Sequence, residues 1–170
     1  MLDSDGAHDS FTAWVASRRD RLLRSTYLLT GDVGRAEDLV QDALVKVARR
    51  WSRLRDTNPD AYIRKVIYHD HVSWWRSRRE VPVAEVLATS PENGSAQDQG
   101  ILIEQALARL TAKQRAVIVL RYVDDVTEVE AAAALGVSVG TVKSQTSAAL
   151  RRLREQAPEL LELRGDGETR

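Results

Sequence analysis

The residues from Ser138 to Arg154 combine charged and hydrogen-bonding groups that suit contact with a nucleic acid. The segment holds four basic residues and no acidic one. Clustered positive charge attracts phosphates, and an amide such as that of Gln145 can pair with a base edge. These residue types predict a DNA-contacting surface. The alternative is an ordinary helical hairpin whose arginines only face water.

The elements that must hold these groups are a helix, a three-residue turn and a second helix over residues 127–154. Thr127 and Glu130 form a capping box, and Gly136 can adopt the left-handed conformation that ends the first helix. Ser138 can cap the second helix. We expect Val137 to lie inward between the two helices. This layout is typical of a helix-turn-helix, whose second helix enters the major groove of DNA.

A second candidate surface lies on the helix predicted for residues 59–79. Basic and aromatic residues recur there at steps of four, three, four and three, which places them along one stripe: Arg64, Tyr68, His71, Trp75 and Arg78. Aromatic rings can stack on unpaired bases while cations follow the backbone. The alternative is that Tyr68 and Trp75 are partly buried core residues.

Catalytic and metal-binding sites are not indicated. His69 and His71 are two residues apart, so that on a helix their side chains point to different sides, and the chain has no cysteine to complete a zinc site. The sequence contains neither a glycine-rich phosphate loop nor a nucleophile elbow. We therefore expect a protein that is not an enzyme and that needs no metal and no small-molecule cofactor.

Composition favours a globular, helix-rich protein. The 170 residues have a net charge of zero, but residues 10–80 contain 15 Lys and Arg against 9 Asp and Glu, so the charge is unevenly distributed. No apolar run approaches the length of a membrane span, and the start of the chain is acidic and unlike a signal peptide. The lack of cysteine fits a cytoplasmic location.

Hydrophobic periodicity and turn residues predict three helices in the N-terminal half of the chain. Gly31 ends the first helix, and Asp32 caps the second. A polar loop over residues 52–58 leads to Asn58 and Pro59, which start the third helix. The second helix has one continuous apolar face: Ala36, Val40, Ala43, Leu44, Val47 and Trp51.

The whole chain is predicted to be all-α, with two small helical domains joined by a flexible linker. Proline, glycine and serine mark the linker, and a capping box of Thr111 and Gln114 opens a helix in the second domain. The predicted boundaries are a disordered tail over residues 1–9, a first domain over 10–80, a linker over 81–100, a second domain over 101–157 and a C-terminal tail over 158–170.

In this order, the chain resembles bacterial RNA polymerase sigma factors of the extracytoplasmic-function (ECF) group, and within it the actinobacterial SigE-like subfamily. In the first domain the resemblance rests on AEDLVQDALVKVARRW at residues 36–51 and PDAYIRKVIYHDHVSWWRSRR at residues 59–79. In the second domain it rests on LTAKQRAVIVLRY at residues 110–122 and GVSVGTVKSQTSAALRRLR at residues 136–154.

The resemblance implies a sigma domain 2 and a sigma domain 4, and it assigns three sets of binding residues. Docking on the β′ coiled coil of core polymerase falls to Asp38, Leu39, Gln41, Asp42, Val45 and Lys46. Recognition and melting of the minus ten element fall to Arg53, Arg55, Asn58, Arg64, Tyr68, His71, Trp75, Arg78 and Arg79, with the loop over residues 52–58 accepting a flipped base. Recognition of the minus thirty-five element falls to Ser138, Thr141, Lys143, Ser144, Gln145 and Arg151.

The expected partners are core RNA polymerase, through its β′ coiled coil and β flap, promoter DNA and an anti-sigma factor. We expect no insertion into a membrane. Gln145 replaces an arginine that is common in the family, which favours an altered base preference. Two other classes stay open: a self-standing regulator that binds DNA as a dimer, and a scaffold that binds only proteins. Neither accounts for both the basic-aromatic stripe and the basic second helix.

Overall fold

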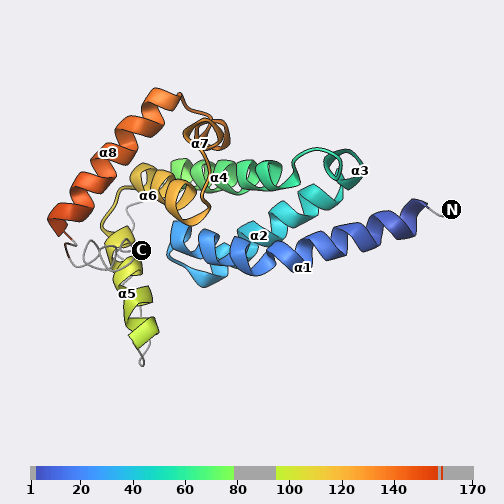
Figure 1. Cartoon of the computed structure of the whole chain (residues 1–170), viewed down its shortest axis with the longest axis horizontal. Coiled ribbons are helices and arrows are strands. Elements are labelled where there is room, and N and C mark those ends of the chain that lie inside the picture. Colours follow the sequence, from blue (N-terminus) through green and yellow to red (C-terminus); the bar gives the residue numbers. More distant parts are fainter. Residues whose placement is uncertain (1–2, 79–94, 157, 159–170) are drawn as a thin grey trace, which may run out of the picture. The chain divides into compact units, whose positions relative to one another are not determined.

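The computed structural model describes residues 3–78, 95–156 and 158, and every regular element in these ranges is helical (Figure 1). The chain divides into two compact units. The first contains α1 (Asp3–Thr30), α2 (Val33–Ala48), α3 (Trp51–Leu54) and α4 (Pro59–Arg78). The second contains α5 (Ser95–Ala108), α6 (Ala112–Ile118), the π-helical turn η1 (Val119–Val123), α7 (Glu128–Leu135) as far as Ala132, and α8 (Val139–Gln156).

The predicted all-α fold with two helical domains is therefore confirmed. Across residues 3–78, 95–156 and 158, no helix is long and apolar enough to cross a membrane.

The core of the first unit forms around α2, which packs against α1 and α4. Leu29 of α1 and Ile63 of α4 are fully buried. The start of α2 is as predicted, because Gly31 has a φ of 72° and Asp32 Oδ1 accepts a hydrogen bond from Arg35 N at 2.6 Å. Apolar residues at helical spacing then form its buried face: Ala36, Leu39, Val40, Ala43, Leu44 and Val47.

Two boundaries in the first unit differ from the predictions. Helix α1 begins at Asp3, so residues 3–9 form part of a helix and not a disordered tail. Helix α2 ends at Ala48, and the predicted loop over residues 52–58 begins inside the helical turn α3. Trp51 is still buried, at 7% exposure, because α3 packs against α1 and α2. Its ring therefore keeps the predicted inward position although it belongs to another element.

In the second unit, α6 packs against α8. The predicted capping box is present, since Thr111 Oγ1 accepts from Gln114 N at 3.3 Å and Gln114 Oε1 accepts from Thr111 N at 3.1 Å. Arg115 Nε donates to Leu107 O at 2.8 Å and so satisfies a carbonyl near the end of α5. Burial lowers the pKa of the Arg115 guanidinium from its usual value.

The second unit also departs from the predictions. Helix α5 begins at Ser95, inside the predicted linker, while residues 81–94 of that linker and residues 159–170 of the predicted tail lie outside the described residues. The helix that starts after Thr111 changes at Val119 to a π-turn, in which Asp124 N donates to Val119 O at 3.0 Å. Periodicity alone does not distinguish such a wider turn from an α-helix.

Candidate functional site

The helix-turn-helix has the predicted local geometry. Thr127 Oγ1 accepts from Glu130 N at 3.2 Å and Glu130 Oε2 accepts from Thr127 N at 2.8 Å, which completes the capping box of α7. Gly136 has a φ of 65°, and Ser138 Oγ accepts from Thr141 N at 3.0 Å at the start of α8. These bonds fix the starts of α7 and α8, and the left-handed Gly136 lies at the end of α7.

Val137 does not lie inward as expected. Its side chain is 40% exposed, and the inward face of α8 is supplied by Val142 and Ala149, which are fully buried. Val137 directly follows the left-handed Gly136, where the chain changes direction. Val137 therefore lies in the turn and belongs to neither helix.

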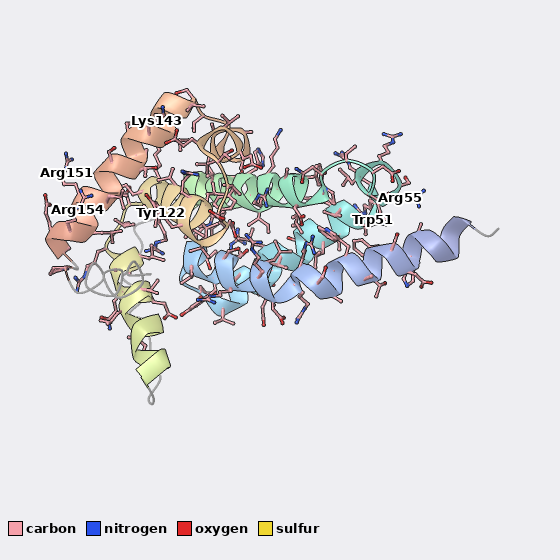
Figure 2. All side chains as sticks on the ribbon, viewed as in Figure 1. Trp51, Arg55, Tyr122, Lys143, Arg151 and Arg154 are labelled. Carbon is pink, nitrogen blue, oxygen red and sulfur yellow. The ribbon has the colours of Figure 1, made fainter. Side chains whose placement is uncertain are left out.

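One face of α8 is exposed and basic. Figure 2 shows Lys143, Arg151 and Arg154 on this helix, and all three are exposed. Because they are separated by steps of eight and three residues, they fall within about a quarter of the helix circumference. Of the other predicted contacts, Ser138, Thr141 and Ser144 are exposed and Gln145 is half-buried. The structure thus places three of the four basic residues on one side, while Arg152 lies on the opposite side of the helix and is half-buried. Gln145 is the least accessible of the predicted set.

Polar groups at the start of α8 already have partners within the protein. Ser138 Oγ lies 2.9 Å from Thr141 Oγ1, and Ser144 Oγ donates to Thr141 O at 3.0 Å. Lys143 Nζ lies 3.6 Å from Glu128 Oε2 of α7. DNA contacts made by these groups would compete with, or add to, these internal bonds.

The segment predicted to accept a flipped base has exposed arginines and bonds between residues close in sequence. Arg53 and Arg55 are exposed, and Arg55 Nε lies 3.5 Å from Asp56 Oδ2. Asn58 Oδ1 accepts from Ala61 N at 2.9 Å and so caps α4, as predicted. Asn58 therefore has a structural role in addition to its proposed role in binding.

The basic-aromatic stripe predicted on α4 is not a continuous surface. Tyr68 and His71 are each only 3% exposed, and Arg64 is half-buried. Helix α4 packs against α2 and α3, and burial of an aromatic ring is strongly favourable, so these two rings belong to the interior. Their assignment to DNA contact is corrected accordingly. The side chains of Trp75 and Arg78, and the whole of Arg79, lie outside the described residues.

Sequence reasoning misses two pairs of cationic and aromatic side chains in the first unit. The Arg50 guanidinium lies 5.6 Å from the centre of the Tyr62 ring, and that of Arg35 lies 4.7 Å from the centre of a Trp74 ring. Both distances suit a cation–π interaction. The basic run over residues 49–55 and the paired tryptophans of α4 are the signals that could have indicated these pairs.

The predicted docking surface on α2 is exposed except at one residue. Leu39 is only 3% exposed and packs in the core, so its assignment to polymerase contact is corrected. Lys46 Nζ lies 2.6 Å from Asp70 Oδ2 of α4, a salt bridge between two helices. The exposed members of the predicted set are Asp38, Gln41, Asp42, Val45 and Lys46.

Two family models match the chain and together span both units. Residues 14–81 match the model described as sigma-70 region 2, and residues 101–153 match the model described as sigma-70, region 4.

Relatives match over most of their length. The RNA polymerase sigma-E factor of Streptomyces avermitilis is 42% identical over 86% of this chain and 84% of the relative. The ECF RNA polymerase sigma factor SigL of Mycobacterium tuberculosis is 34% identical over 82% of this chain and 84% of the relative. Among solved structures, the sigma factor RpoE from Bartonella quintana, in complex with the anti-sigma factor NepR, has a TM-score of 0.68 and 31% identity, and covers 89% of this chain and 96% of that chain.

Proposed function

Because the chain belongs to the ECF group of bacterial RNA polymerase sigma factors, we propose that the predicted site residues other than the buried Leu39, Tyr68 and His71 perform its three binding tasks. A sigma factor binds core RNA polymerase and directs promoter-specific initiation of transcription. A self-standing regulator that dimerises on DNA is set aside, since the sigma-70 match extends over region 2 as well as region 4.

Recognition of the minus thirty-five element is assigned to α8. The observation that carries this assignment is the exposed basic face of α8, which begins at a helix start capped by Ser138. The capped N-terminus and its dipole favour an anionic phosphate near Ser138 and Thr141. Lys143, Ser144, Gln145 and Arg151 are the remaining contacts of this set.

Recognition of the minus ten element is assigned to the segment between α2 and α4, together with residues of α4 and the residue that follows it. Support comes from the exposed guanidinium groups of Arg53 and Arg55 and from Asn58, with Arg64, Trp75, Arg78 and Arg79 as further contacts. Extrusion of a base costs a few kcal/mol, which fixed protein contacts must offset.

Binding of core polymerase is assigned to the exposed face of α2. The mixed charge of Asp38, Asp42 and Lys46 supports a polar interface. Regulation by an anti-sigma factor is proposed by analogy with the Bartonella quintana RpoE, whose structure contains one. The protein acts in the cytoplasm, where core polymerase works, and it directs the catalysis of that enzyme without chemistry of its own.

A reconstituted transcription assay with purified core polymerase and a promoter library tests the function. Lys143→Ala should weaken promoter binding several-fold and reduce the salt slope by about 1, because one phosphate contact is lost. Lys113→Ala, at an exposed lysine of α6, is the matched control. Equal salt slopes for Lys143→Ala and wild type would contradict the assignment, and a wild-type protein that does not bind core polymerase would contradict the function.

A further inference from the structure

Helix α1 contacts the beginning of the segment that connects α2 and α4. Trp51 Nε1 of α3 donates to Ser10 Oγ of α1 at 2.8 Å. The Trp51 ring also meets two aromatic rings of α1, with its centre 5.3 Å from that of Phe11 and 5.4 Å from that of Trp14. Trp51 is therefore held through both its polar atom and its apolar surface.

The same helix also contacts the first turn of α4, directly after this segment. Arg18 Nε lies 3.2 Å from Asp60 Oδ1, and Arg18 Nη2 lies 3.5 Å from Asp60 Oδ2. Asp60 stands in the first turn of α4, directly after the Asn58 cap and Pro59. Two nitrogen atoms face two oxygen atoms, which restricts the orientation of both side chains.

Backbone bonds connect the held ends to the exposed residues between them. Arg55 N donates to Trp51 O at 2.9 Å, and Thr57 N donates to Leu54 O at 3.0 Å. Arg55 therefore depends directly on the position of Trp51. Figure 2 shows Trp51 and Arg55 on the same short stretch of chain.

We propose that α1 is a brace for the minus ten recognition segment, and that Ser10 and Arg18 are positioning residues. This inference rests on the proposed role of residues 52–58. A segment that accepts an extruded base must be ordered beforehand, because its contacts have to offset the cost of extrusion. The two contacts of α1 hold the chain at Trp51 and at Asp60, on either side of residues 52–58, and so restrict the backbone that carries Arg55.

The first test compares two hydroxyl deletions on α1 in the holoenzyme. Ser10→Ala removes the acceptor of Trp51 Nε1, whereas Thr12→Ala removes an exposed hydroxyl two residues away, on the opposite side of the helix. The readout is base discrimination within a minus ten element randomised in a promoter library with a constant minus thirty-five element. Ser10→Ala should lower the discrimination by between about twofold and about tenfold, the range of one net hydrogen bond. Thr12→Ala should leave it unchanged, and Ser10→Thr should restore it.

The second test separates positioning from direct DNA contact by Arg18. Arg18→Gln and Asp60→Asn both break the ion pair, but Asp60→Asn leaves the Arg18 charge free for phosphates. If α1 is a brace, both variants lower minus ten discrimination by a similar factor. If Arg18 instead contacts DNA, Asp60→Asn strengthens promoter binding without loss of discrimination, which would overturn the proposal.

Two controls make the outcome specific. Binding to core polymerase and to a minus thirty-five duplex should be unchanged in every variant, because neither surface includes α1. Unchanged discrimination in Ser10→Ala would reduce the Ser10–Trp51 bond to a purely structural contact and would overturn the inference. A wild-type holoenzyme with no minus ten preference would instead contradict the proposed function of the segment.

Discussion

The carboxylate of Glu128 on α7 lies 3.6 Å from the ammonium group of Lys143 on α8. The side chains are 37% and 63% exposed, so water screens the pair and its contribution to stability is small, about 0–1 kcal/mol. Its importance lies in binding, because the same ammonium group is proposed to meet DNA. In that case Glu128 and a DNA phosphate would compete for the ammonium group of Lys143.

Replacing Glu128 by glutamine should strengthen binding to a minus thirty-five duplex by up to about fivefold and steepen the salt dependence, because Lys143 no longer has an internal anionic partner. A fluorescence anisotropy titration at several salt concentrations measures both. The control is Asp125→Asn, which removes an exposed acid outside this pair; the residue has a φ of 53°, which asparagine tolerates. An equal gain in the control would mean that general charge, and not the pair, sets the affinity.

Leu39 and Val45 lie on the same helix, but their replacement should affect different properties: stability for Leu39 and polymerase binding for Val45. Leu39→Ala should lower the free energy of unfolding by about 2–5 kcal/mol, since the side chain is buried. Val45→Ala, at a residue 40% exposed, should change stability by less than about 1 kcal/mol and weaken core polymerase binding. Urea unfolding and a polymerase binding assay separate the two effects. A folded, stable Leu39→Ala protein with impaired docking would restore Leu39 to the interface.

Asp42→Ala should impair binding to core polymerase while leaving affinity for a minus thirty-five duplex unchanged. The carboxylate is exposed on α2 and is proposed to pair with a basic group of the polymerase. Glu37→Ala removes another exposed acid of α2 that does not belong to the proposed surface. Surface plasmon resonance on immobilised core polymerase measures the difference. The docking role of Asp42 fails if the two variants bind equally well.

Two glycines of the helix-turn-helix should give effects of opposite sign. Gly136→Ala should destabilise the protein by about 1–2 kcal/mol, because φ is 65° there and an L side chain resists that conformation. Gly140→Ala should stabilise α8 by about 0.5–1 kcal/mol, because alanine loses less conformational freedom than glycine when the helix forms. The added Cβ fits, since it would lie at an ordinary 3.7 Å from Ser138 Oγ. Thermal unfolding followed by circular dichroism checks both, and a destabilised Gly140→Ala would show that this contact is tighter than it looks.

Helix starts were predictable because each depends on a few neighbouring residues. Asp32, Asn58, Thr111, Thr127 and Ser138 all cap the helices that the sequence assigns to them. Leu39 was also predictable, since it lies on the apolar face between Ala36 and Ala43. Its inclusion in the docking set came from the family motif and not from periodicity.

The burial of Tyr68 and His71 could not be predicted from spacing. Steps of three and four residues describe a packed helix face as well as an exposed one. Which face α4 turns inward depends on its contacts with α2 and α3, which are distant in sequence. The pairs Arg50–Tyr62 and Ser10–Trp51 likewise connect separate elements.

The five side-chain caps share one property: each accepts the backbone N–H of the residue three positions later. Such bonds close very short loops, so they form without the entropy loss of bringing distant segments together. Helix starts can therefore be set in the order in which the chain is synthesised, before the interhelical contacts of either unit exist. Local contacts of this kind are typical of fast-folding helical domains.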